Sequence, residues 1–222
     1  MPTVSDLRPA RLALAALAIV SAETAQAHPH VFVDARAAFL VTDEGQLHAL
    51  RISWTYDAFT TLRLFETLDL DRDGDGALDD ADRAAIVAGE TDWPPEYKGD
   101  TWLELGGAPR PLTRPENASA LMEDERITVT FDLPLETPAD LAGLEAILRL
   151  YDPIFYYAYT IHPAAGLAPD LPGTCTTRIV PFEPDETTFA LKEKLSALSR
   201  EETPEDENVG RLFTDELHLS CR

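Results

Sequence analysis

The residues from Asp71 to Asp82, DRDGDGALDDAD, constrain the fold of this chain more than any other segment. They place carboxylates at positions 1, 3, 5, 9 and 12, glycine at position 6 and an aliphatic residue at position 8. This spacing is typical of an EF-hand-type calcium loop, because the hard cation takes about six to eight oxygen ligands and the glycine permits the sharp turn between them. The sequence therefore predicts a helix–loop–helix over 57–90.

Apolar residues flank this loop at helical spacing. They are Phe59, Leu62, Phe65 and Leu68 before the loop, and Ala84, Ala85, Ile86 and Val87 after it. Such spacing indicates one amphipathic helix on each side. The alternative is an acidic, solvated turn between two helices.

The expected calcium ligands all come from the loop. They are the side chains of Asp71, Asp73 and Asp75, the main-chain carbonyl of Ala77, Asp79 through a water molecule, and Asp82. Asp82 stands where such loops usually have glutamate, and its shorter side chain predicts a modest affinity that is partly shared with Mg²⁺. Because the sequence has one such loop and calcium sensors usually pair two, we expect a structural site.

The first 27 residues carry the features of a secretory signal peptide. After a short basic start, Leu12–Val20 form an apolar run too short to span a bilayer, and Ala25-Gln26-Ala27 offers small residues for cleavage. Cleavage after Ala27 would make His28 the first mature residue, and cleavage after Ala22 is the alternative. No later stretch is apolar enough to cross a membrane. We therefore expect a single exported domain over 28–222.

Charge and cysteine content narrow the class of protein further. The net charge is −22, with 40 acidic against 18 basic side chains. Such a field repels nucleic acid and anionic lipid surfaces and attracts cations. The two cysteines, Cys175 and Cys221, both lie in the exported part. An even count in an oxidising compartment favours a disulfide between them, and two free thiols are the alternative.

Hydrophobic alternation predicts that the rest of the domain is mainly β. Strands are expected at 31–42, 46–56, 102–105, 126–133, 146–161, 176–182 and 212–221, the first two joined by a turn at Glu44-Gly45. Residues 183–210 are expected to form an amphipathic helix and an acidic loop. Short strands with proline-rich turns predict an α+β fold, an antiparallel β-sandwich-like domain in which the helix–loop–helix is an insertion.

His28-Pro29-His30 at the expected mature terminus forms a second group of potential metal ligands. The α-amine and imidazole of His28 can chelate one ion, with His30 supplying another nitrogen and His162 as the distant candidate for a third. The square-planar amino-terminal site needs a backbone N–H at residue 2, which Pro29 lacks, so Zn²⁺ or copper is the expected ion. The alternative is a frayed terminus whose histidines bind nothing.

Signatures of catalysis are missing from the sequence. It contains no Gly-x-Ser-x-Gly, no His-Glu-x-x-His and no phosphate-binding glycine loop, and no cysteine remains free once the disulfide forms. We therefore expect a binding protein and not an enzyme.

Several segments resemble, in their order, a bacterial protein family. They are His28 to Phe32 directly after the signal peptide, Trp54-Thr55-Tyr56-Asp57, the Asp71 loop, Tyr151-Asp152-Pro153 and the terminal cysteine. Over nearly all of the mature chain they resemble the family called domain of unknown function 1007. Its members are described as periplasmic components of an uncharacterised transport system associated with nickel/cobalt-type or zinc-related permeases. The resemblance implies metal handling with an inner-membrane metal permease as partner, and no established reaction.

Three functions are consistent with these features. The first is a periplasmic accessory protein of a transition-metal (Zn, Ni, Co or Cu) transport system, which binds its metal near His28 and calcium at the Asp71 loop. The second is a calcium-stabilised protein-interaction module that binds no transition metal. The third is a copper enzyme with a terminal histidine brace. The first residue of the mature chain distinguishes the first two functions. Cleavage after Ala22 would leave residues before His28, so the α-amine of His28 could not bind a metal ion.

Overall fold

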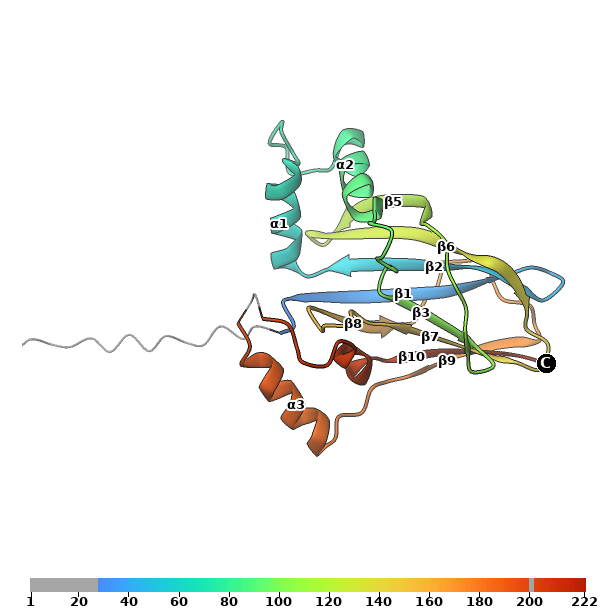
Figure 1. Cartoon of the computed structure of the whole chain (residues 1–222). Helices are drawn as coiled ribbons and strands as arrows, with labels where there is room; N and C mark the ends of the chain where they lie inside the picture. Colours follow the sequence, from blue (N-terminus) through green and yellow to red (C-terminus); the bar gives the residue numbers. More distant parts are fainter. Residues whose placement is uncertain (1–27, 200–201) are drawn as a thin grey trace, which may run out of the picture.

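The computed structural model describes residues 28–199 and 202–222, so the expected signal peptide lies outside the described residues. The described chain is mainly β and forms two five-stranded sheets, with helices beside them (Figure 1). No helix in this part of the chain is long and apolar enough to cross a membrane.

The first sheet has the strand order β5-β6-β2-β1-β8. Its strands are β1 (Val31–Val41), β2 (Gln46–Tyr56), β5 (Glu116–Glu123), β6 (Arg126–Asp140) and β8 (Tyr157–His162). β1 and β2 form the antiparallel pair expected from their alternating pattern, which buries every second residue of β1 from Val31 to Phe39. β1 pairs in parallel with β8, whereas the other neighbouring strands of this sheet are antiparallel.

The second sheet has the strand order β4-β3-β7-β10-β9. Its strands are β3 (Thr101–Leu105), β4 (Ala108–Pro109), β7 (Glu145–Leu150), β9 (Cys175–Val180) and β10 (Glu216–Cys221). All pairs in this sheet are antiparallel. Cys175 and Cys221 lie directly opposite each other on β9 and β10 and form a disulfide, with their Cα atoms 4.1 Å apart. The predicted cysteine pairing is confirmed.

Apolar residues of both sheets form one continuous hydrophobic core. Ile52 and Phe131 of the first sheet and Leu148 and Leu219 of the second are fully buried within it. Burial of a side chain of this size contributes about 1.5–3 kcal/mol to folding. The core therefore holds the two sheets together.

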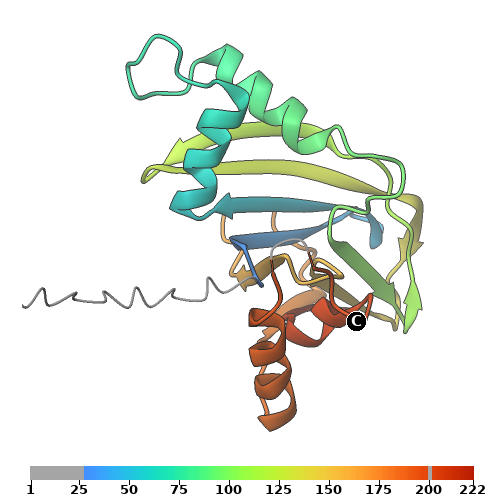
Figure 2. The same cartoon turned by 60° about the vertical axis from the view of Figure 1, so that its left-hand side comes forward.

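The described chain has three α-helices, each capped by an aspartate, and one 3-10 helix. They are α1 (Ala58–Leu68), α2 (Asp80–Thr91), α3 (Glu186–Ser196) and the 3-10 helix η1 (Val209–Phe213). The Asp57 carboxylate accepts a hydrogen bond from the N–H of Thr60 at 2.7 Å and another from Phe32 at 2.9 Å, so it starts α1 and fixes it to β1. α1 and α2 lie beside the β5–β6 side of the first sheet, and α3 lies on the opposite side of the molecule (Figure 2).

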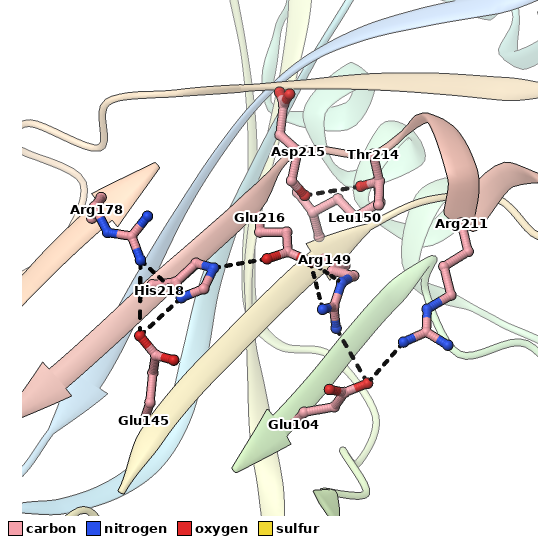
Figure 3. A network of polar contacts seen from close by, with 10 residues as sticks. All are labelled: Glu104, Glu145, Arg149, Leu150, Arg178, Arg211, Thr214, Asp215, Glu216 and His218. Carbon is pink, nitrogen blue, oxygen red and sulfur yellow. Dashed lines mark hydrogen bonds and ion pairs between the residues drawn. The ribbon is translucent and has the colours of Figure 1, made fainter. Parts of the chain in front are cut away.

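A chain of ion pairs runs across the second sheet on the face that points away from the core (Figure 3). Arg149 binds Glu216 at 2.5 Å and Glu104 at 3.2 Å, and His218 binds Glu145 and Glu216 at 2.9 and 2.8 Å. Burial raises the pKa of Glu216, but hydrogen bonds from His218 and Arg149 outweigh it, so its pKa is lowered. Each partly buried charge in this network has a partner of opposite charge. We therefore interpret the network as a contribution to the stability of the sheet.

The structure differs from the sequence expectation in several strands. The single strand expected at 146–161 is divided into β7 and β8, which belong to different sheets. Between them the Asp152 carboxylate accepts hydrogen bonds from the N–H groups of Ile154, Tyr156 and Tyr157. These bonds stabilise a turn, and an extended strand cannot continue through it. The strand expected at 212–221 begins at Glu216 after η1, and the strand expected at 126–133 continues to Asp140. β4 and β5 were not anticipated.

Candidate functional site

The Asp71 loop joins α1 to α2, and its first three acidic positions converge. Asp71, Asp73 and Asp75 each offer a carboxylate oxygen, and these oxygens lie within 4.8 Å of one another. Gly76 has a φ of +80°, which allows its N–H to face the Asp71 carboxylate at 3.1 and 3.2 Å. Leu78 is buried in the core and anchors the loop. Three converging carboxylates are a donor set that suits a hard divalent cation.

Asp79 and Asp82 have a different role from the first three acids in this structure. They form a capping box at the start of α2, in which each carboxylate accepts the backbone N–H of the other residue, at 2.8 and 3.0 Å. The second oxygen of Asp82 accepts the N–H of Asp71 at 3.2 Å, so this buried side chain closes the two ends of the loop. Of the predicted ligand carboxylates, the structure thus brings Asp71, Asp73 and Asp75 together.

His28 and His30 lie together at the start of β1. Their ring centroids are 5.2 Å apart, and both rings lie against Tyr156, at 6.1 and 4.6 Å between centroids. The N–H groups of His30 and Val31 both donate to the Tyr156 carbonyl, which fixes the segment to the turn before β8. The side chain of His28 is buried, and within the described part of the chain its Nδ1 has no hydrogen-bond partner.

Burial lowers the pKa of His28, and the nearby Asp152 carboxylate opposes that effect only in part. The imidazole is therefore neutral at neutral pH, which is the form that binds a metal ion. The structure does not bring His162 to this pair. Parallel pairing places Tyr157 beside Val31 and His162 at the far end of β8, where its Nε2 lies 3.0 Å from Asp34.

A cavity of about 470 Å³ lies beside the histidine pair, with Tyr156 in its wall. Its other walls come from the C-terminal end of α2, the segment 92–100, the turn 152–157 and Tyr56 at the end of β2. Asp100 is 4% exposed and accepts a hydrogen bond from the Tyr159 hydroxyl at 2.7 Å. Burial raises the pKa of Asp100 to about 7.

Glu90 is the second carboxylate that the fold places in this cavity. It accepts a hydrogen bond from the Tyr56 hydroxyl, and burial raises its pKa. Sequence analysis did not identify Glu90 or Asp100 as functional residues. Neither belongs to a motif, and their partners come from distant segments, so a scan for local spacing could not find them.

Comparison with known proteins identifies relatives of unassigned activity. A family model described as "Protein of unknown function (DUF1007)" matches residues 13–221. A protein of Haemophilus influenzae described as "Uncharacterized protein" is 24% identical over 201 residues, which cover 88% of this chain and 91% of that protein. Neither description states a ligand or a reaction.

Proposed function

This chain belongs to the DUF1007 family, and we propose that it is a periplasmic metal-binding accessory protein of a transition-metal transport system. The observation that carries the proposal is the His28–His30 pair, with ring centroids 5.2 Å apart at the expected mature terminus. Cleavage after Ala27 would add the α-amine of His28 to the two imidazoles. Three nitrogen donors suit Zn²⁺ or copper.

The burial of His28 supports this assignment. A buried imidazole nitrogen usually finds a hydrogen-bond partner, because leaving it without one costs about 1–3 kcal/mol. The Nδ1 atom of His28 has no such partner among the described residues, and a bound metal ion would supply one. In the proposed role the protein binds the metal in the periplasm and passes it to an inner-membrane permease.

We also propose that the Asp71 loop is an EF-hand-type calcium site, with Asp71, Asp73, Asp75 and the Ala77 carbonyl as ligands. The convergence of the three carboxylates supports it. Because Leu78 and Ile86 connect the loop and α2 to the core, an ion bound there would stabilise the folded domain. If the histidines bind no metal, this site alone supports the second function, a calcium-stabilised interaction module.

The test is calorimetric titration of the mature protein, starting at His28, with Zn²⁺ or Cu²⁺ in excess Ca²⁺. We expect one site, weakened about tenfold or more by His28→Ala or His30→Ala because each removes a ligand. His48→Ala, which removes an exposed histidine of β2, is the matched control and should leave binding unchanged. Absence of binding would refute the transition-metal function. Equal affinity in a protein with extra residues before His28 would exclude the terminal amine.

A further inference from the structure

We propose that the cavity between the end of α2 and the turn 152–157 binds a small organic ammonium ion. We call it the aromatic–acidic cavity, and its main lining residues are Tyr56, Glu90, Trp93, Tyr97, Asp100 and Tyr157. Its volume of about 470 Å³ is within the usual range for small-molecule sites, about 300–1,000 Å³. The proposal is independent of a metal ion at His28.

The charges of this cavity have one sign. Four of its lining residues are acidic, namely Glu90, Asp92, Asp100 and Asp152, and the described residues that line it include no lysine, arginine or histidine. Asp100 is buried and Glu90 is partly buried, and their side-chain partners are tyrosine hydroxyls. A buried carboxylate without a cation is costly to ionise.

One buried carboxylate elsewhere in the fold has a cationic partner. Asp132 is 5% exposed, close to the 4% of Asp100, yet it is bound by Arg51 at 2.7 Å. Asp82 is also buried, but backbone N–H groups satisfy its carboxylate. Within the described chain, neither Asp100 nor Glu90 has an ion pair with a basic side chain. The cationic partner that Asp132 has is thus missing at the cavity, where tyrosine hydroxyls are the side-chain partners, and a positively charged ligand would supply it.

The aromatic walls indicate what kind of cation fits. Trp93 and Tyr97 meet edge to face at 5.3 Å, and Tyr156 and Tyr157 lie 5.6 Å apart, so two pairs of aromatic rings line the cavity together with the acidic groups. Aromatic faces combined with carboxylates recognise ammonium groups through cation–π contacts and charge. An inorganic ion gains little from such walls, whereas the carbon chain of an amine packs against them.

The arrangement of the oxygen atoms also disfavours a metal ion. Among the described residues, Asp71, Asp73 and Asp75 are the group whose ligand atoms all lie within 4.8 Å of one another. The acids of the cavity form no such group, and a divalent metal needs several ligand atoms around one point. An organic cation can instead contact carboxylates that lie apart.

The test is titration of the mature protein at pH 8 in excess Ca²⁺, so that the Asp71 loop does not compete. The probes are putrescine, choline and n-butylamine, and 1,4-butanediol is the uncharged isostere of putrescine. We expect at least one amine to bind at a single site and the diol not to bind. Comparison of the three amines identifies whether one ammonium, two, or a quaternary group is preferred.

Variants locate the site. Asp100→Asn and Glu90→Gln should each weaken binding about tenfold or more, since each removes a charge from the cavity while keeping an oxygen that accepts a tyrosine hydrogen bond. Glu123→Gln removes one exposed charge of β5 and should have no effect. If Asp100→Asn does not fold, Glu90→Gln carries the test. Absence of binding by all amines, or equal weakening by Glu123→Gln, would overturn the proposal.

Discussion

Replacing Asp100 with asparagine should stabilise the protein above about pH 7, because it removes a titration that opposes folding. Burial raises the pKa of Asp100 from 3.8 to about 7. Between these values the folded state keeps the proton that the unfolded state releases, so the stability contributed by this group falls as the pH rises and stays low above pH 7. The two pKa values correspond to a loss of about 4 kcal/mol, at about 1.4 kcal/mol for each pH unit.

Asparagine is suited to this position in both backbone and side chain. Residue 100 has a φ of +46°, a left-handed conformation that asparagine adopts more readily than most residues. Its amide oxygen can accept the hydrogen bond that the Tyr159 hydroxyl now donates to Asp100 at 2.7 Å. The substitution therefore removes the titrating group with little change in packing.

The assay is urea denaturation of the wild type and Asp100→Asn in constant excess Ca²⁺ from pH 4 to pH 8. The stability difference in favour of the variant should increase by about 4 kcal/mol across this range, mostly between pH 4 and pH 7. Glu123→Gln, at an exposed site, serves as the control and should show no such trend. A difference between Asp100→Asn and the wild type that stays constant with pH would refute the argument.

Three further predictions concern the loop, the disulfide and one glycine. Ca²⁺ should raise the melting temperature of the wild type in calorimetry, and the double variant Asp71→Ala with Asp73→Ala should lose this response. Replacing both cysteines with serine should lower the free energy of unfolding by up to about 4 kcal/mol in urea denaturation, since the bridge closes a loop across 46 residues. Gly99→Ala should lower the melting temperature and shift the tryptophan fluorescence, because its φ is +65° and a Cβ there would lie 2.3 Å from the Trp93 ring. A double aspartate variant that responds to Ca²⁺ like the wild type would contradict the first prediction. A cysteine-free variant with the wild-type denaturation midpoint would contradict the second, and a Gly99→Ala variant with the wild-type emission spectrum would contradict the third.

Local sequence patterns were sufficient to predict the structural elements that are determined by residues close together in the sequence. The strict alternation from Val31 to Phe39 predicts one buried face, and the structure contains the β1–β2 pair. The pairing of Cys175 with Cys221 followed from their even number and from the oxidising compartment expected for an exported chain, and β9 and β10 place them opposite each other. The sandwich arrangement of the sheets and the calcium loop stay predictions.

Features that depend on distant residues could not be predicted in this way. The apolar and aromatic residues of 146–161 have the composition of one strand, and the Asp152-Pro153 step indicates only a bend in it. The Asp152 carboxylate, however, accepts hydrogen bonds from three backbone N–H groups that follow it, and this turn separates two strands. The aromatic–acidic cavity is lined by Tyr56, Glu90, Asp100 and Tyr157. These residues are far apart in the sequence, and only the tertiary packing of the chain brings them together. The His28–His30 pair was predicted, but the separation of His162 follows from the parallel register of β8, which has no local signal.

The parallel pairing of β1 with β8 also bears on how this chain folds. β1 lies near the beginning of the described residues, and β8 follows only after β2 through β7. Contacts between distant segments form slowly, because the intervening chain must first lose its freedom. Until β8 arrives, β1 presents an unpaired edge with the apolar face of Val31 and Val33, and such edges associate with one another. A chain that ends before Tyr157 keeps this edge permanently open, so truncated forms of the protein will aggregate where the complete chain folds.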